Sequence, residues 1–150
     1  MKNAFTMIEL IFVIVILGIL ASVAIPKLSA TRSDAVISKL AQNIATGAAE
    51  ISTYAMSKSE VDSNFTVMSN AMASMENSGD AVLSDNKAEI KVGSVSDCIV
   101  VLVDVNTTTG VDTLKMVFND AGGDTKCLAI QGAIDENKYP MKLRGTSVKY

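Results

Sequence analysis

The feature that most limits the possible folds of this chain is a continuous apolar segment near the N-terminus. It reads FTMIELIFVIVILGILASVAIP, from Phe5 to Pro26, and three of its side chains are polar: Thr6, Glu9 and Ser22. The 21 residues from Phe5 to Ile25 would span roughly 32 Å as a helix, close to the ~30 Å hydrocarbon core of a bilayer. Because apolar residues cover every side of such a helix, a membrane-spanning helix is favoured over a buried helix of a soluble protein.

A cleavable secretory signal is the second interpretation of this segment. Met1 and Lys2 supply a short basic start, and Ser22 to Ala24 offer a small-x-small cleavage site. A mature protein produced in this way would begin near Ile25. The apolar run is long for a signal, Glu9 interrupts its beginning, and the helical pattern continues beyond the site, so the membrane span remains the favoured interpretation.

Glu9 is the residue that does not suit an apolar segment. An acidic side chain at the bilayer centre costs about 2.5–3.5 kcal/mol, and less toward the interface. Glu9 is either a tolerated interfacial carboxylate or a functional group whose cationic partner lies in the same apolar layer. The flanking charges do not decide the orientation, because Lys2 on one side is nearly balanced by Lys27 and Arg32 on the other.

Composition excludes several classes of function. The chain has no histidine, which removes Ser-His-Asp and Cys-His catalysis and the usual zinc sites. It carries a net charge of −3 and no run of basic residues, so it offers no surface for nucleic-acid phosphates. Neither a phosphate-binding loop nor a dinucleotide-binding fingerprint occurs. We therefore expect a protein that is not an enzyme, needs no cofactor and binds no nucleic acid directly.

Beyond the apolar segment the helical pattern continues. From Val36 to Ala55 apolar residues recur at spacings of three and four, which predicts an amphipathic continuation of the helix over residues 27–56. Pro26 removes a backbone hydrogen bond and Gly18 is a weak helix former, so we expect the helix to kink or loosen at these two residues. Residues 5–26 and 27–56 would then form one long helix.

The remaining residues, 57–150, predict a globular head. Ser57 and Glu60 match a capping box, which predicts a short helix over about residues 58–77. Runs rich in β-branched residues, separated by turn sequences, predict antiparallel strands over about residues 88–131, in a meander of three or four strands followed by a C-terminal tail. The predicted fold class is α+β: a long N-terminal helix packed on a small antiparallel sheet.

The two cysteines, Cys98 and Cys127, both lie in the predicted head. In an exported domain such a pair favours one disulfide. A simple meander would place them two strands apart, about 9.6 Å, which exceeds the ~7 Å that a disulfide allows between Cα atoms. The bridge therefore requires the middle strand to end early or the strand order to differ. We favour the bridge.

A turn in the predicted head carries oxygen donors. Asn119, Asp120 and Asp124 belong to the sequence NDAGGD, and oxygen ligands suit calcium. The spacing does not match an EF-hand, and acidic glycine-rich turns are common. An ordinary turn is therefore favoured over a metal site.

The segment Phe5 to Pro26, preceded by the short basic leader MKNA, resembles the class III signal of type IV pilins and of the pseudopilins of type II secretion. The resemblance implies that a prepilin peptidase removes residues 1–4 by cutting between Ala4 and Phe5, and that Phe5 is then N-methylated. The family usually has glycine before the cut, where this chain has Ala4. The resemblance also implies the pilin fold, and the major pseudopilins of the family can bind calcium in the head.

The same resemblance implies a role for Glu9, which becomes the fifth mature residue. In the family this carboxylate meets the N-terminal amine of a neighbouring subunit during filament assembly. The implied protein is a structural subunit, held in the bacterial inner membrane with its head in the periplasm, that polymerises into a filament in the periplasm or at the cell surface. The implied partners are other copies or other pilins, the prepilin peptidase, an assembly ATPase and an inner-membrane platform protein.

Several alternatives remain open at the level of sequence. The filament would serve secretion, adhesion and motility, or DNA uptake. A membrane-anchored periplasmic binding domain that never polymerises is the rival from another class of function. It would keep its first four residues and tolerate loss of the Glu9 carboxylate.

Overall fold

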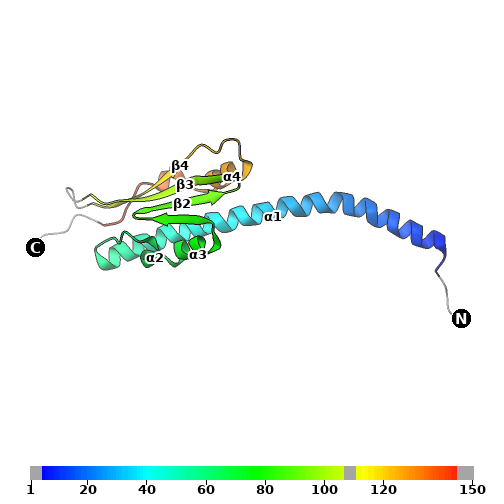
Figure 1. Ribbon diagram of the computed structural model, residues 1–150, viewed down its shortest axis with the longest axis horizontal. Coiled ribbons are helices and arrows are strands. Elements are labelled where there is room, and N and C mark those ends of the chain that lie inside the picture. Colours follow the sequence, from blue (N-terminus) through cyan, green and yellow to red (C-terminus); the bar gives the residue numbers. More distant parts are fainter. Residues whose placement is uncertain (1–4, 107–110, 145–150) are drawn as a thin grey trace, which may run out of the picture. The chain divides into compact units, whose positions relative to one another are not determined.

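The computed structural model of the protein describes residues 5–106 and 111–144. Its first element is helix α1, Met7–Lys58, which is 52 residues long (Figure 1). The chain divides into two compact units within this helix: the first extends to Val36 and the second begins at Ile37. The second unit is the head.

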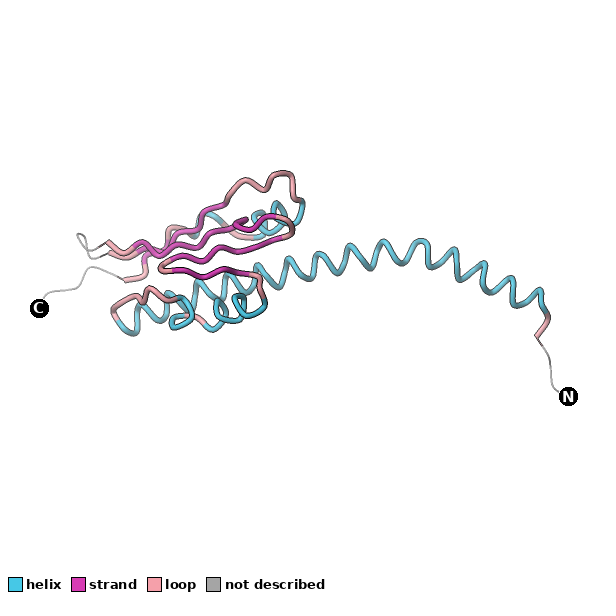
Figure 2. Tube along the Cα trace, viewed as in Figure 1, coloured by secondary structure: helices cyan, strands magenta, loops and turns pink. Residues whose placement is uncertain are grey.

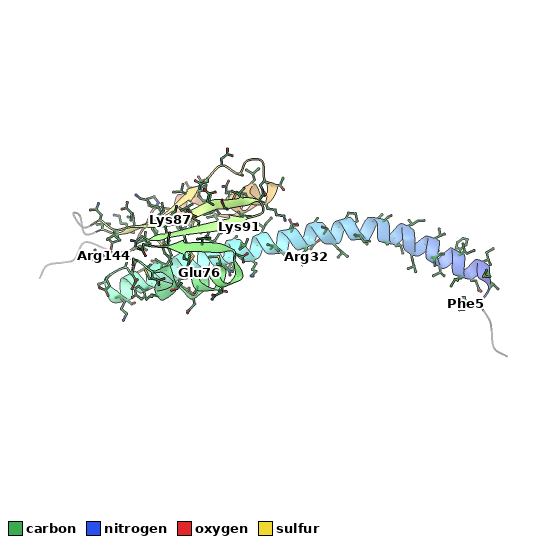
Figure 3. The ribbon with its side chains drawn as sticks, in the orientation of Figure 1. Phe5, Arg32, Glu76, Lys87, Lys91 and Arg144 are labelled. Atoms are coloured by element: carbon green, nitrogen blue, oxygen red, sulfur yellow. A yellow bond between two sulfur atoms is a disulfide. The ribbon has the colours of Figure 1, made fainter. Side chains whose placement is uncertain are left out.

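The first unit, as described, consists of residues 5–36. None of its side chains is buried. Its apolar side chains lie exposed along the helix, as the sticks between Phe5 and Arg32 show in Figure 3. By length and composition α1 is able to cross a membrane, as expected for residues 5–26.

The head contains a five-stranded antiparallel sheet, shown by the magenta strands that lie side by side in Figure 2. The strands follow the order of the sequence, β1-β2-β3-β4-β5. The strands are β1 (Ala81–Ser84), β2 (Lys87–Val92), β3 (Val95–Asp104), β4 (Thr113–Phe118) and β5 (Met141–Lys142). The predicted antiparallel meander is therefore confirmed. The sheet begins before residue 88 and has five strands. The prediction lacked the short strands β1 and β5.

The core of the head lies between α1 and one face of the sheet. The buried stripe of α1 has helical spacing and is apolar: Leu40, Ile44, Ala48, Ile51 and Ala55. It belongs to the same buried cluster as alternate residues of β2, β3 and β4, among them Ile90, Ile99, Val101 and Leu114. Register places Ile90 opposite Ile99, so these side chains share one face. The predicted α+β architecture is confirmed.

The helical boundaries differ from the predicted ones. Helix α1 ends at Lys58 and contains Ser57, so the predicted capping box of Ser57 and Glu60 is wrong. Ser59, with φ of 58°, takes the left-handed conformation that ends the helix. In place of one helix over residues 58–77 there are two, α2 (Phe65–Met68) and α3 (Asn70–Ser78), capped by the side chains of Asn64 and Ser69.

Helices α2 and α3 complete the core from the side. They bury Phe65, Met68, Met72 and Met75. Gly47 of α1 lies against Met72 of α3, because a Cβ at this position would lie 2.7 Å from Cε of Met72. The methionines of α2 and α3 are therefore part of the core packing.

The last predicted strand is also wrong. Residues 125–133 form helix α4 (Thr125–Ala133), followed by a 3-10 turn, η1 (Glu136–Lys138). The side chain of Asp124 accepts hydrogen bonds from the backbone N–H groups of Lys126 and Cys127, which makes it the N-cap of α4. Cys127 and Ile130, three residues apart, are both buried, which is helical rather than strand spacing.

Candidate functional site

The N-terminal end of α1 holds Glu9, and the structure gives this carboxylate a local partner. Oε2 of Glu9 accepts hydrogen bonds from the backbone N–H of Thr6 at 2.9 Å and from the Thr6 hydroxyl at 2.8 Å. The backbone N–H of Glu9 donates in return to Oγ1 of Thr6 at 3.4 Å. Thr6 and Glu9 thus form a reciprocal capping box. The pattern Thr-x-x-Glu before an apolar run was the signal for it, and the sequence analysis missed it.

The capping box leaves part of the carboxylate available. Both donors of Thr6 bind Oε2, and within the described residues Oε1 of Glu9 receives no hydrogen bond. An ionised carboxylate accepts at both oxygens, so Oε1 is able to receive a cation from outside the chain. Phe5, directly before the capping box, is 79% exposed. Ala4 and the rest of residues 1–4 lie outside the described residues, so the predicted cut between Ala4 and Phe5 stays a prediction.

The helix around Glu9 presents an apolar surface on all sides. We call this set of exposed side chains the apolar helix surface: Phe5, Met7, Ile8, Leu10, Ile11, Phe12, Val13, Ile14, Val15, Ile16, Leu17, Ile19, Leu20, Val23, Ile25 and Leu28. No soluble monomer gains from exposing such an area, which marks a surface made for lipid or for other protein.

Gly18 and Pro26 lie within this helix, and helix α1 continues through both. Pro26 has no N–H to donate to the preceding turn. Ser22 donates its hydroxyl to the carbonyl of Ile19 at 2.7 Å. The kink expected at Gly18 and Pro26 stays a prediction.

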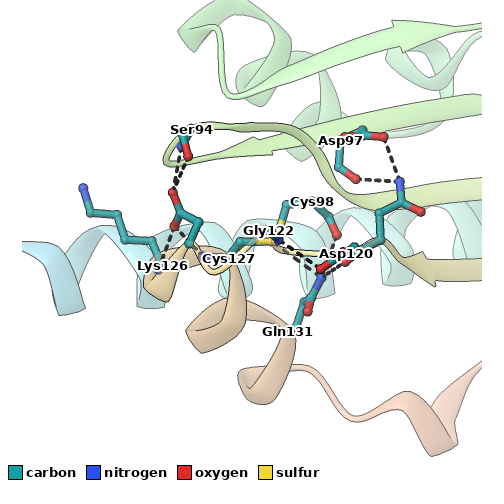
Figure 4. Close-up of a disulfide and its surroundings, with 10 residues drawn as sticks. Ser94, Asp97, Cys98, Asp120, Gly122, Lys126, Cys127 and Gln131 are labelled. Carbon is teal, nitrogen blue, oxygen red and sulfur yellow. Dashed lines mark hydrogen bonds between the residues drawn. A yellow bond between two sulfur atoms is a disulfide. The ribbon is translucent and has the colours of Figure 1, made fainter.

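In the head, a disulfide joins Cys98 of β3 to Cys127 of α4, with 5.8 Å between the Cα atoms (Figure 4). The predicted separation of two strands, too long for a disulfide, does not apply here. Cys127 lies on helix α4, which packs on the sheet, and not on a strand. Beside the bridge, Nε2 of Gln131 donates to the carbonyls of Cys98 at 3.0 Å and Asn119 at 2.7 Å. The disulfide and these bonds fasten α4 to the sheet.

Asp124 provides a second connection between α4 and the turn that contains Ser94. Its Oδ2 accepts hydrogen bonds from the backbone N–H of Ser94 at 2.9 Å and from the Ser94 hydroxyl at 2.8 Å (Figure 4). These bonds, the backbone one foremost, hold the pKa of the Asp124 carboxyl well below its usual range. Gly93, with φ of 60°, faces this carboxylate so closely that a Cβ would lie 2.4 Å from Oδ2.

The three candidate calcium ligands have separate partners. Nδ2 of Asn119 donates to the carbonyl and the carboxylate of Asp97. Asp120 accepts from the backbone of Gly122, and Asp124 is occupied as described. In the described part of the chain no group of three or more Cys, Asp or Glu residues is arranged to hold a metal ion. The structure gives these residues structural roles.

A buried ion pair, not foreseen from the sequence, lies at the other end of the sheet. Asp112 is fully buried, and its Oδ2 lies 2.6 Å from Nε of Arg144, an ion pair without normal hydrogen-bond geometry. The backbone N–H of Asn106 donates to Oδ1 of Asp112 at 3.2 Å. Arg144 also donates from Nη1 to the carbonyl of Ser59, directly after α1, at 3.2 Å. We call Asp112, Arg144 and the Ser59 carbonyl the arginine clasp.

A groove beside α1 holds a further carboxylate. It has a volume of about 350 Å³ and is lined by parts of α1, α2 and α3. Within it, Oε2 of Glu50 accepts from the Ser69 hydroxyl at 2.7 Å and from the backbone N–H of Ala71 at 3.0 Å. The backbone bond from Ala71, foremost, lowers the pKa of the Glu50 carboxyl. Glu50 therefore supports the start of α3.

Comparison with known proteins adds one finding. Residues 1–25 match the family model described as the prokaryotic N-terminal methylation motif. No curated protein and no solved structure matches the chain.

Proposed function

We propose that this chain, which carries at residues 1–25 the class III prepilin signal of type IV pilins and pseudopilins, is the precursor of a structural subunit that polymerises into a type IV pilus-like filament. The observation that carries the proposal is that a carboxylate and an exposed apolar surface occur together at the start of α1. A carboxylate with one free oxygen, on Glu9, lies within an apolar helix surface for which the described residues provide no cover.

Processing is the first step of the proposed function. A prepilin peptidase hydrolyses the bond between Ala4 and Phe5, and the new N-terminus is methylated. The α-amine created on Phe5 is protonated at neutral pH, because such amines have a pKa of about 7.7–8.0. The subunit then carries a cation on Phe5, just before α1, and a carboxylate on Glu9, in the first turn of α1.

Assembly is the second step. When identical helices pack side by side, the amine of one subunit reaches the Glu9 carboxylate of its neighbour. In an apolar bundle a broken ion pair costs about 3–5 kcal/mol, because the remaining charge stays desolvated and unpaired. The pair therefore penalises wrong registers of one helix against the next. Transfer from lipid to the filament exchanges one apolar environment for another, so the apolar helix surface opposes it little.

The cellular setting follows from these steps. The helix of residues 5–26 anchors the subunit in the inner membrane before assembly, with the head in the periplasm. The disulfide between Cys98 and Cys127 supports this side of the membrane, since disulfides persist in oxidising compartments. An assembly ATPase and an inner-membrane platform protein extract the subunit into the filament. The role is structural and not enzymatic.

Mass spectrometry of the N-terminus of the protein, purified from its native membranes, tests the proposal. The expected N-terminal residue is methylated Phe5. An intact Met1 would instead identify an anchored domain that does not polymerise, and a start near Ile25 would identify a secreted protein. Electron microscopy of cells that overproduce the chain then tests polymerisation, for which filaments that contain the protein are the expected result.

A further inference from the structure

A five-residue pattern, Asp-x-Asn-x-Thr, occurs twice in the chain. It reads DSNFT from Asp62 to Thr66 and DVNTT from Asp104 to Thr108. Asn-x-Thr, with x other than proline, is the acceptor sequence for N-linked glycosylation. Thr107 and Thr108 lie outside the described residues, so the structural argument concerns the first copy alone.

Asn64 lies on the surface, in the stretch between α1 and α2, and its side chain is exposed. Its Oδ1 accepts hydrogen bonds from the backbone N–H of Thr66 at 2.9 Å and from the Thr66 hydroxyl at 2.8 Å. Among the described residues, Nδ2 of Asn64 takes part in no hydrogen bond. The acceptor nitrogen is therefore free, while the threonine hydroxyl contacts the same amide group.

The neighbours of Asn64 hold it in this position. Phe65, the middle residue of Asn-x-Thr, is fully buried in the core and fixes the backbone on both sides of it. Oδ1 of Asp62 accepts the backbone N–H of Asn64 at 2.8 Å. An open cavity of about 270 Å³, lined in part by Asn64 and Thr66, lies beside the amide. Asn64 is thus both anchored and accessible.

We propose that Asn64 is a site of N-linked glycosylation and that Asp62 to Thr66 is the recognised unit. The donor is an oligosaccharide linked to a polyprenyl diphosphate. Nδ2 of Asn64 attacks the anomeric carbon of the first sugar, a carbon–nitrogen bond forms, and the bond from that carbon to the phosphate oxygen breaks. The polyprenyl diphosphate leaves, and one proton of Nδ2 passes to a base of the transferring enzyme. Nothing is oxidised or reduced.

Asp62 belongs to the unit because each of the two Asn-x-Thr sequences of the chain has an aspartate two residues before its asparagine. Its charge would meet a basic group of the transferring enzyme two residues before the acceptor. The proposal rests on the proposed function in one respect: the head must lie outside the cytoplasm, where a lipid-linked donor is presented. The modification is otherwise independent of polymerisation.

Peptide mapping of the full-length protein, purified from its native host, tests the proposal. Trypsin releases residues 59–87 as one peptide, because no lysine or arginine lies between Lys58 and Lys87. In the natural protein we expect this peptide to carry a glycan that fragmentation places on Asn64 and that alkaline β-elimination does not release. An unmodified peptide, or a glycan on a serine or threonine, would overturn the proposal.

Matched variants separate the modification from folding. Asn64→Asp keeps an oxygen that caps α2 and lacks the acceptor nitrogen, so the glycan should be lost while the melting temperature of the enzymatically deglycosylated form is retained. Thr66→Ala should abolish the glycan and Thr66→Ser should retain it. Asn70→Asp, an exposed change on the same peptide, should have no effect. A glycan that persists in Asn64→Asp or Thr66→Ala would refute the assignment.

Asp62→Asn tests the extent of the unit. We expect at least a tenfold lower occupancy of Asn64, and unchanged occupancy would remove Asp62 from the recognised unit. The N-terminal peptide of the same digests reports separately on processing. Methylated Phe5 with an unmodified Asn64 would overturn the glycosylation and leave the filament proposal standing, and a glycan with an intact Met1 would do the reverse.

Discussion

Residues 5–36 and the head use aliphatic and aromatic side chains in opposite ways. Phe12 in the first unit is 69% exposed, whereas Phe65 in the head is completely buried. The head buries its apolar residues within its own fold, between α1 and the sheet. The first unit has no core in the described structure and needs lipid or other protein to cover it. High hydropathy therefore indicates where burial is needed and does not say which molecule provides it.

The acidic residues of the two regions repeat this contrast. Asp112 lies in the core of the head and has its cation, Arg144, in the same chain. Glu9 lies in the apolar helix, where the described residues provide the Thr6 donors but no cation. The buried carboxylate of Asp112 thus finds its cation within its own molecule. We infer that the charge of Glu9 is satisfied when a second molecule arrives.

Removal of the Glu9 carboxylate should have the largest effect. Glu9→Ala should leave processing at Phe5 intact and abolish filaments, because the amine of the neighbouring subunit loses its partner in an apolar environment. N-terminal mass spectrometry and electron microscopy measure the two outcomes. Glu60→Ala, which changes an exposed carboxylate of the head, is the control and should give normal filaments. Normal filaments from Glu9→Ala would contradict the pairing mechanism.

A pair of identical substitutions tests the contrast in packing. Phe65→Ala should lower the free energy of unfolding of the head by about 3–5 kcal/mol, because it opens a cavity in the core. Phe12→Ala should change it by no more than about 0.5 kcal/mol, because the residue contacts no core. Urea unfolding in detergent micelles, followed by tyrosine fluorescence, measures both. Equal effects would mean that the first unit contributes to the core of the head.

Loss of the disulfide should come next in size. The double substitution Cys98→Ser and Cys127→Ser should destabilise the head by about 3 kcal/mol, since a crosslink between residues 29 apart no longer restricts the unfolded chain. Unfolding of the oxidised and reduced natural protein provides the comparison. A difference near zero would show that Asp124 and Gln131 alone are sufficient to hold α4 on the sheet.

The smallest effect concerns pH. The pKa of Asp124 is lowered in the folded state, so its contribution to stability is complete above the unfolded pKa and disappears as the pH falls below about 4. Asp124→Asn should therefore lower the melting temperature at pH 7 and have less effect near pH 2. Thermal unfolding at a series of pH values checks this. A penalty that stays constant down to pH 2 would show that the charge of Asp124 is not involved.

The first helix and the fold class were predictable because both depend on long, regular patterns. Twenty-one nearly uninterrupted apolar residues and a stripe spaced by three and four leave few alternatives for Phe5 to Ala55. The β-branched runs of β2 to β4, separated by turn sequences, likewise predicted an antiparallel meander. Such patterns are repeated over many residues, so a local exception does not alter the result.

The short elements were not predictable in the same way. Residues 125–133 contain Cys127, Ile130 and other residues common in strands, and the local signal for a helix is a single side chain, the N-cap Asp124. In the sequence this aspartate stood out only as a candidate calcium ligand. A capping box was predicted at Ser57 and Glu60, where α1 instead continues to Lys58, and the capping box of Thr6 and Glu9 was not recognised. Single hydrogen bonds decide such boundaries, and tertiary contacts decide which bonds form.

The arginine clasp has a mechanical consequence. Nη1 of Arg144 donates a hydrogen bond to the carbonyl of Ser59, which follows the last turn of α1. The buried stripe of α1 from Leu40 to Ala55 lies against the sheet. A force applied along α1 therefore acts in shear on the whole buried stripe, and the arginine clasp holds the C-terminal end of the helix. In this direction the contacts of the stripe break together and not one after another.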